Sequence, residues 1–229
     1  RMFTSVPDRY DLVNRLITLG LDQLWRGRAL ERVMGGWPAR VMDLCTGTGD
    51  MSVMTARRAP VDTRIMAVDF VGPMLQEAAR KARRQGVADR IRWVRADAAA
   101  LPFVDGSFDA VTIAFGFRNL TFRNPGRDRY LAQILRVLAP GGRFVVVESS
   151  QPTWAPWRWA VHTYTRTLVG PVGGAVSGQR GAYRYLAHSM RHFHTPEEVK
   201  DLLLGAGFSN VQHDPLLGGV AGITVANRL

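Results

Sequence analysis

The feature that most constrains the fold is an alternation of short apolar segments with helical segments, joined by short connections. Five apolar runs have the length of buried strands and cover residues 40–45, 64–70, 91–97, 108–115 and 143–149. Helical patterns lie between them at residues 50–59, 73–86 and 127–142. This alternation predicts an α/β fold, a doubly wound parallel sheet with helices on both faces. In such sheets, ligands bind beyond the carboxyl ends of the strands.

The rest of the chain completes one domain. Two helical segments precede the alternation and end near Gly20 and Gly35, and residues 208–228 have the pattern of a strand pair. The sequence shows no internal repeat, low-complexity tract or linker, so we predict a single domain over residues 1–229. With 229 residues, 46% of them hydrophobic, the chain is long enough to bury a sizeable core.

The amino-acid composition limits the cellular locations and the kinds of binding partner to be expected. No apolar run approaches the roughly 18–20 residues of a membrane-spanning helix, and the start of the chain lacks a secretory signal pattern. A single cysteine, Cys45, excludes an internal disulfide and fits a cytoplasmic protein. The net charge of +11, from 30 basic and 19 acidic residues, attracts polyanions such as nucleic acid or an anionic membrane. Solubility and genome composition explain this charge equally well.

Glycine and aspartate stand where the first three strands end. In the loop at 43–50, DLCTGTGD, Gly47 and Gly49 allow a tight turn and a close approach of the backbone to a ligand. Asp69 ends the second strand, 20 residues after Gly49, where a carboxylate suits both hydroxyls of a ribose. Asp97 ends the third strand, where it is placed to bind an adenine amino group. The alternatives are a plain tight turn for the glycines and helix capping for each aspartate.

The same loop differs from a dinucleotide site. The dinucleotide pattern requires a third small residue after Gly49; that position is Ser52, and the loop continues through acidic Asp50. A carboxylate beside the loop disfavours a pyrophosphate. The loop therefore favours a ligand with an amino acid tail and no phosphate.

Several motifs carry a family resemblance. The segments VMDLCTGTGD, VDF, RADAAALPFVDGSFDAV and LRVLAPGG resemble successive motifs of class I S-adenosylmethionine-dependent methyltransferases. Longer stretches resemble one branch, the UbiE/MenG/Coq5-like quinone C-methyltransferases, at residues 9–26, 101–119, 138–152 and 182–190. This similarity covers nearly the whole chain.

The resemblance implies a Rossmann-like, mostly parallel seven-stranded sheet with an antiparallel C-terminal strand. It also implies a lid formed by N-terminal helices (1–36) and by an inserted helical segment (152–192) that faces substrate and membrane. The implied cofactor is S-adenosylmethionine, without a metal. The expected cofactor contacts are Asp43, Gly47, Thr48, Gly49, Asp69, Phe70, Asp97, Ala98 and Ala114. Ala114 stands where some relatives carry a serine, so one hydrogen bond to the cofactor is lost.

The end of the fourth strand, in TIAFGFRN, is the predicted catalytic position. Arg118 is permanently charged and a poor base, so its expected role is to stabilise a quinolate oxygen or to hold a water that accepts the proton. Asn119 is expected to orient a ring oxygen, and Gly116 to leave room for the ring. Tyr10, in the expected lid, is a further candidate for hydrogen bonding to the quinol. The alternatives are that Arg118 pairs with a structural acid and that Tyr10 is a packing residue.

The inserted stretch 152–174 is rich in tryptophan and arginine. On a helix, Trp154, Trp157, Tyr164 and Leu168 share one stripe, beside a stripe that contains Arg158, His162 and Arg166. Indoles beside arginines suit a membrane interface. A lid packed on the domain, with solvated arginines, is the equal alternative.

These observations predict S-adenosylmethionine-dependent C-methylation of a polyprenyl hydroquinone, with demethylmenaquinol favoured over a benzoquinol. Another hydrophobic acceptor is the alternative within enzymes. A basic RNA-binding protein or a non-catalytic assembly partner is the alternative from another class. We expect a cytoplasmic protein with a lipophilic quinol substrate and no nucleic-acid partner. Peripheral contact with the inner, anionic face of the membrane and a homodimer are left open.

Overall fold

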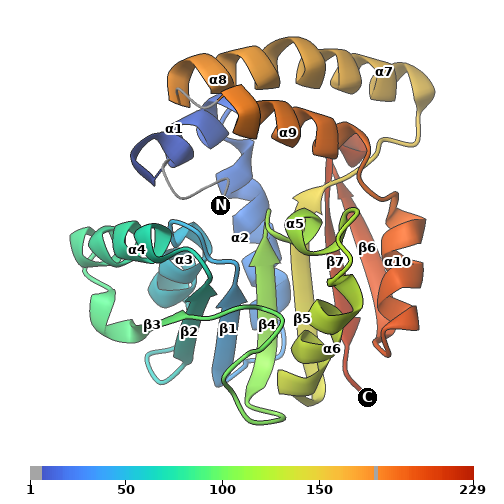
Figure 1. The fold of residues 1–229 in the computed structure, drawn as a ribbon. Coiled ribbons are helices and arrows are strands. Elements are labelled where there is room, and N and C mark those ends of the chain that lie inside the picture. The colour runs from blue at the N-terminus through green and yellow to red at the C-terminus, as the bar shows by residue number, and fades with distance from the viewer. Residues whose placement is uncertain (1–6, 178–179) are drawn as a thin grey trace.

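The computed structural model describes residues 7–177 and 180–229, and they contain one seven-stranded sheet in the order β3-β2-β1-β4-β5-β7-β6 (Figure 1). The strands are β1 (Arg40–Leu44), β2 (Arg64–Asp69), β3 (Ile91–Arg95), β4 (Phe108–Ala114), β5 (Leu138–Ser149), β6 (Ser209–Leu216) and β7 (Ala221–Asn227). Each strand overlaps a predicted one. Only β5 begins clearly earlier than predicted, because Leu138 already pairs with Phe108 of β4.

The strand directions confirm the predicted mixed sheet. Strands β3, β2, β1, β4 and β5 pair in parallel, and β7 runs antiparallel to both β5 and β6. The central strands are apolar on both faces because both faces are covered: Val41, Met42, Val111 and Ile113 are completely buried. This is why they appear in the sequence as continuous apolar runs.

Helices cover the two faces of the sheet, as the doubly wound fold requires. One face carries α2 (Leu21–Met34), α3 (Asp50–Arg58) and α4 (Gly72–Arg84), whose apolar side chains join the strands in two buried clusters. The opposite face carries α5 (Phe117–Thr121), α6 (Arg127–Val137) and α10 (Pro196–Gly205), around Phe117, Phe144 and Leu203. Short 3₁₀ turns, η1 (Ala88–Arg90) and η3 (Leu217–Gly219), complete the connections.

A helical lid lies over the carboxyl ends of the strands (Figure 1). It consists of α1 (Pro7–Thr18), α7 (Ala155–Tyr164), the π-helical turn η2 (Thr165–Val169), α8 (Gly170–Ser177) and α9 (Arg180–Arg191). Helix α8 contacts α1 and α9, and the Tyr164 hydroxyl donates a 2.9 Å hydrogen bond to the carbonyl of Ile17. Of the two N-terminal helices expected in the lid, α1 lies in it, while α2 packs mainly against the sheet.

None of the helices in the described part of the chain is both long enough and apolar enough to cross a membrane.

Candidate active site

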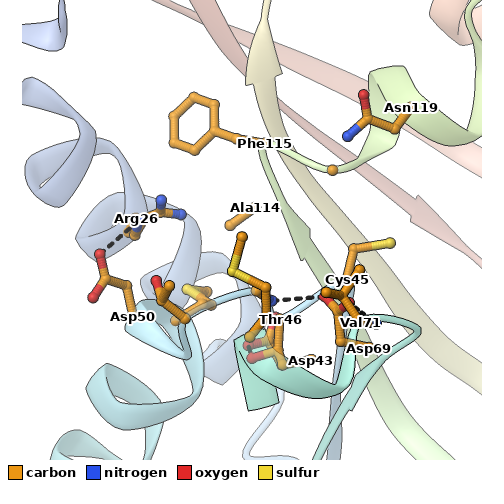
Figure 2. A pocket seen from close by; sticks show the side chains of 15 residues that line it. Arg26, Asp43, Cys45, Thr46, Asp50, Asp69, Val71, Ala114, Phe115 and Asn119 are labelled. Atoms are coloured by element: carbon orange, nitrogen blue, oxygen red, sulfur yellow. Dashed lines mark hydrogen bonds and ion pairs between the residues drawn. The ribbon is translucent and has the colours of Figure 1, made fainter. Parts of the chain in front are cut away.

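A cavity of about 150 Å³ lies where the carboxyl ends of β1, β2 and β4 meet helix α2 (Figure 2). This is the position at which a doubly wound sheet binds its ligand. The predicted residues that line it are Asp43, Gly47, Thr48, Asp69, Ala114 and Asn119. Further lining residues are Arg26, Cys45, Thr46, Asp50, Met51, Val71, Met74, Phe115 and Gly116.

The glycine loop after β1 is shaped by left-handed backbone. Gly47 has φ of 56° and Gly49 has φ of 81°, conformations that glycine adopts without strain. A Cβ on Gly49 would lie 2.8 Å from the Cβ of Ala78, so this glycine also lets α4 approach the loop. A Cβ on Gly47 would meet nothing within 4 Å, since this residue borders the cavity. The predicted close approach of backbone to ligand therefore belongs to Gly47, and Gly49 serves packing.

Asp43 is buried at the floor of the cavity with half of its carboxylate unsatisfied. Oδ2 accepts 2.6 Å hydrogen bonds from the hydroxyls of Thr46 and Ser52. Oδ1 is buried and has no hydrogen-bond partner among the described residues. Burial raises the pKa of Asp43 to about 6, although both hydroxyls oppose the shift. An unpartnered carboxylate oxygen beside a cavity calls for a donor from a ligand.

Asp69, at the end of β2, is held in place by backbone amides. Its two oxygens accept 2.8 Å hydrogen bonds from the amides of Gly47 and Val71. Burial raises its pKa, and hydrogen bonds from the amides of Val71, Gly47 and Phe70 counteract the shift. A carboxylate has about four acceptor positions, so Asp69 keeps capacity to accept from a ligand hydroxyl.

The acidic charge of Asp50 is balanced by two cations, a point that the sequence did not reveal. Its Oδ1 accepts a hydrogen bond from Nζ of Lys81, and its Oδ2 lies 4.0 Å from Nε of Arg26. Burial alone would raise the pKa of Asp50, but Arg26 and Lys81 lower it below its ordinary value. Lys81 also contacts Asp11 of α1 at 2.5 Å, so the lid helix is tied to this cluster.

Thr48 is the second link between the lid and the glycine loop. Its hydroxyl donates a 2.5 Å hydrogen bond to Asp11, the carboxylate that also contacts Lys81. Thr48 lines the cavity as predicted, but in this arrangement its hydroxyl faces α1. Its expected contact with the cofactor stays a prediction.

A second cavity, of about 90 Å³, lies between the sheet edge and the lid. Its walls are mostly apolar and come from α1, α2, α9 and the ends of β4 and β5. They include Ile17, Trp25, Phe115, Leu186, Met190, Val220 and Ala221, with polar groups supplied by Asn14, Thr18, Asp22, Arg26, Arg118 and Ser149.

Arg26 and Phe115 line both cavities and form the wall between them. The guanidinium carbon of Arg26 lies 4.8 Å from the centre of the Phe115 ring, an arrangement that stabilises a buried cation. Phe115 and Cys45 both have positive φ, 62° and 57°, so two strand ends turn in left-handed conformations around the site. Such conformations are costly for side chains larger than glycine and cluster at functional sites.

Arg118 lines the second cavity, but its charge is paired. Nη1 lies 2.7 Å from Oε1 of Glu148 and donates a 2.8 Å hydrogen bond to the hydroxyl of Ser149. Both members of the ion pair are buried. The structural acid that the sequence analysis left open as an alternative is thus present. Nε of Arg118 is buried without a hydrogen-bond partner among the described residues.

Three of the remaining predicted residues, Phe70, Asp97 and Ala98, do not line either cavity. Phe70 is exposed, and Ala98 is buried in the core rather than in a cavity wall. Asp97 is exposed and accepts a 2.8 Å hydrogen bond from the amide of Ala99 in a turn; no helix of the described chain lies between it and β4, so it is not the helix cap of the alternative. Tyr10 lies on α1, but its side chain is outside the described residues. Among the described residues, no group of three or more His, Cys, Asp or Glu is placed to hold a metal ion.

Gly116 lines the first cavity, and its expected role of leaving room for a ring stays a prediction. A Cβ there would lie 2.6 Å from the Cβ of Cys45, so the glycine also allows two loops to approach each other. Arg26 and Glu148 were missed. Nothing distinguishes Arg26 from the other arginines in the sequence, and Glu148 occurs inside an apolar strand, where a lone carboxylate is itself a signal of a buried partner.

The chain is similar to known proteins over nearly its whole length. The profile of the ubiE/COQ5 methyltransferase family matches residues 1–228. The chain is 44% identical to a Thermus thermophilus protein named demethylmenaquinone methyltransferase, over 99% of this chain and 100% of that protein. It is 37% identical to a Geotalea uraniireducens protein named ubiquinone/menaquinone biosynthesis C-methyltransferase UbiE, over 99% and 94%.

The fold is also that of known methyltransferases. The crystal structure of a SAM-dependent methyltransferase from Aquifex aeolicus is similar with a TM-score of 0.65, at 16% identity, over 96% of this chain and 98% of that chain. At this identity, the likeness concerns the fold alone. Together with the full-length sequence matches, it leads to one conclusion: the chain belongs to the ubiE/COQ5 methyltransferase family.

Proposed function

We propose that this protein transfers a methyl group from S-adenosylmethionine to a ring carbon of a polyprenyl hydroquinone, with demethylmenaquinol as the acceptor. The observation that carries the proposal is the pair of cavities that share the wall of Arg26 and Phe115. One cavity is acidic and borders the glycine loop; the other is mostly apolar. A methyl donor and a lipophilic ring placed in them would meet at this wall.

The residues of the first cavity fit S-adenosylmethionine. When bound, this cofactor supplies a methyl group on a positively charged sulfur. An electron-rich carbon attacks that methyl group. The unpartnered Oδ1 of Asp43 is suited to accept from the α-ammonium of the amino acid tail, and the fixed carboxylate of Asp69 from the ribose hydroxyls. The carboxylates of Asp43 and Asp69 in the cavity wall also favour a cationic ligand.

Arg26 is the best-placed partner for the α-carboxylate of the cofactor. It is buried, and its Nε has no hydrogen-bond partner among the described residues. Its ion pairs with Asp22 and Asp50 both start from this Nε and are long, at 3.8 Å and 4.0 Å, so they leave the Nε–H without a hydrogen bond. A carboxylate is the ligand that a guanidinium binds best, through paired hydrogen bonds.

Two groups are assigned to the acceptor: Arg118, which lines the second cavity, and Asn119, which lines the first. Methylation at carbon requires the quinol oxygen to develop negative charge, and a donor fixed beside that oxygen lowers the barrier. Arg118 brings the unsatisfied Nε–H, while Glu148 holds its guanidinium in place. Because Glu148 neutralises most of its charge, Arg118 acts here chiefly as a positioned hydrogen-bond donor. Asn119 lines the neighbouring cavity and is exposed, so it can turn toward a ring oxygen.

The acceptor is assigned as a naphthoquinol on the names of relatives and on one sequence feature. The T. thermophilus relative is named for demethylmenaquinone, whereas the G. uraniireducens relative is named for both ubiquinone and menaquinone. The turn at residues 149–152, Ser-Ser-Gln-Pro, resembles the menaquinone members more closely. We expect kcat/KM for a short-chain demethylmenaquinol to exceed that for a matched benzoquinol by at least about tenfold, as one ring's burial allows. The opposite preference would reassign the acceptor.

The alternatives from another class predict different measurements. An RNA-binding protein would bind generic RNA in a salt-sensitive way at low micromolar concentration or below. An assembly partner with a methyltransferase fold would fail to bind S-adenosylmethionine in a calorimetric titration. Either result, with no methyl transfer, would replace the proposed function.

A further inference from the structure

The lid carries a segregated positive charge. Between residues 149 and 196, the sequence contains five arginines and neither aspartate nor glutamate, although the whole chain has 19 acidic residues. This stretch forms α7, η2, α8 and α9 and so makes up most of the lid. This stretch therefore carries five positive charges without a compensating acidic residue, and its helices lie over the carboxyl ends of the strands (Figure 1).

The outer side of α7 and η2 combines arginine with tryptophan. Trp159 is 71% exposed, and Arg158 and Arg166 are exposed on the same stripe, since seven or eight residues complete two helical turns. Neither arginine has an acidic partner within 4.0 Å among the described residues. Trp154 and Leu168 add apolar area, with 69% and 45% of their surface exposed.

Part of the stripe expected from the sequence packs on the domain. Trp157 is half-buried and donates a 3.2 Å hydrogen bond to the carbonyl of Leu217. The hydroxyl of Tyr164 donates to the carbonyl of Ile17 of α1, and His162, from the neighbouring stripe, lies 2.9 Å from Gln151. Since Trp154 and Leu168 of the expected stripe are exposed, one side of this helical segment packs on the domain and the other faces outward.

Helix α1 adds an apolar surface at the same end of the molecule. Leu12 and Leu16 are four residues apart, so they lie on one side of the helix, and they are 53% and 47% exposed. Leu19, in the turn that follows the helix, is 79% exposed. Arg15, between Leu12 and Leu16, is exposed. Helix α1 contacts α8 and contributes Asn14, Ile17 and Thr18 to the wall of the second cavity.

We propose that the outer surface of α1, α7 and η2 docks on an anionic lipid bilayer. The proposal rests on the proposed function, because a polyprenyl acceptor resides in the bilayer. Its physical basis is the combination of unpaired arginines, which anionic headgroups attract, with exposed indole and leucine side chains, which enter the interface. The second cavity lies directly beneath, lined by α1 and α9, so a docked lid places the acceptor cavity next to the lipid that supplies the acceptor.

Vesicle flotation tests the surface independently of methylation. The full chain is mixed with vesicles of phosphatidylcholine alone and of phosphatidylcholine with phosphatidylglycerol. We expect binding to the anionic vesicles only, and a loss of more than about tenfold in the partition coefficient for Arg158→Glu/Arg166→Glu. Arg64→Glu/Arg92→Glu, with the same change in net charge on exposed positions of β2 and β3, should bind as the wild type does.

The apolar part has a matched pair as well. Trp159→Ala should weaken binding severalfold, whereas Trp37→Ala, which removes a 79% exposed indole near the amino end of β1, should not. Equal losses in test and control variants, no vesicle binding by the wild type, or binding of RNA in place of vesicles would overturn the proposal. None of these variants alters the wall of the first or second cavity, so all should methylate a water-soluble short-chain acceptor as the wild type does. If the wild type binds the vesicles as expected but methylates no such acceptor, the proposed function is wrong and the docking surface stands.

Discussion

Asp43 is the residue whose chemistry the fold changes most. Burial raises its pKa to about 6, and its Oδ1 has no hydrogen-bond donor among the described residues. Only the ionised carboxylate binds an ammonium group strongly. A proton therefore competes with the cofactor below this pKa, and no such competition exists above it. We expect the dissociation constant of S-adenosylmethionine to rise about tenfold for each pH unit below about 6 and to be flat from about 6.5 to 7.5.

Calorimetric titration across this pH range measures the effect. Asp43→Asn should bind more weakly at neutral pH and lose the acid dependence, because an amide has no proton to gain. Ser52→Ala serves as a control: it removes one hydrogen bond to the carboxylate and should move the pH of the transition upward without abolishing it. A wild-type affinity that does not change between about pH 5 and 7 would contradict the assigned role.

Arg118 requires a variant that separates catalysis from stability. Arg118→Ala leaves the buried Glu148 without its partner, which costs about 3–5 kcal/mol of folding free energy. Arg118→Gln/Glu148→Gln removes both charges and keeps hydrogen-bonding groups, so it should fold well. If Arg118 contacts the acceptor oxygen, the double variant should still show kcat lowered by about 100-fold, with unchanged cofactor affinity.

Turnover by this double variant close to the wild-type rate would show that the pair is only structural. Glu148→Gln alone separates the two members further. It keeps the guanidinium and should lower kcat less than the loss of Arg118 does.

At the scale of elements, Asp11 holds α1 to the glycine loop. This carboxylate contacts Lys81 at 2.5 Å and Thr48 at 2.5 Å, and both partners are far away in the sequence. We expect Asp11→Asn to raise hydrogen exchange of α1 amides by about tenfold, because a largely buried ion pair is lost. Asp201→Asn, an exposed carboxylate on α10, should leave α1 unchanged. Equal protection of α1 in wild type and Asp11→Asn would mean that other contacts hold the helix.

Gly49, in the turn between β1 and α3, can be compared with Gly86, which follows α4 and has a similar backbone conformation. Gly49 and Gly86 have φ of 81° and 69°, but only a Cβ on Gly49 would clash, with Ala78 at 2.8 Å. Gly86→Ala should cost about 1 kcal/mol, the strain of the left-handed conformation alone. Gly49→Ala should cost roughly 3 kcal/mol, since overpacking is added. Equal destabilisation in denaturant titrations would contradict the packing role.

Most elements are predictable from the sequence because their signals are local. The apolar runs of β1 and β4 and the glycine that ends α4 act within a few residues of themselves, and all appear where predicted. The cluster around Asp50 is not predictable in this way. Its cations come from α2 and α4, and among 30 basic residues nothing local distinguishes Arg26 and Lys81 from those that face solvent.

At the scale of the whole molecule, topology places the site before any side chain is considered. Parallel strands joined by helices bring the ends of β1, β2 and β4 to one edge, and the glycine loop and Asp69 lie there as predicted. Asp97, at the end of β3, follows the same pattern but is exposed and does not line the cavity. A strand end thus predicts the neighbourhood of a residue, while the direction of its side chain depends on the turn that follows.

If the two cavities hold the cofactor and the quinol, a methyl group passes between them at the wall formed by Arg26 and Phe115. The most direct test is incubation with S-adenosylmethionine labelled with ¹³C in the methyl group and a short-chain demethylmenaquinone, with and without a chemical reductant. We expect NMR to show a labelled methyl group on a carbon of the naphthoquinone ring. We expect this label only when the reductant has formed the hydroquinone. Label on an oxygen, label without reductant, or no transfer by protein that binds the cofactor would contradict this expectation.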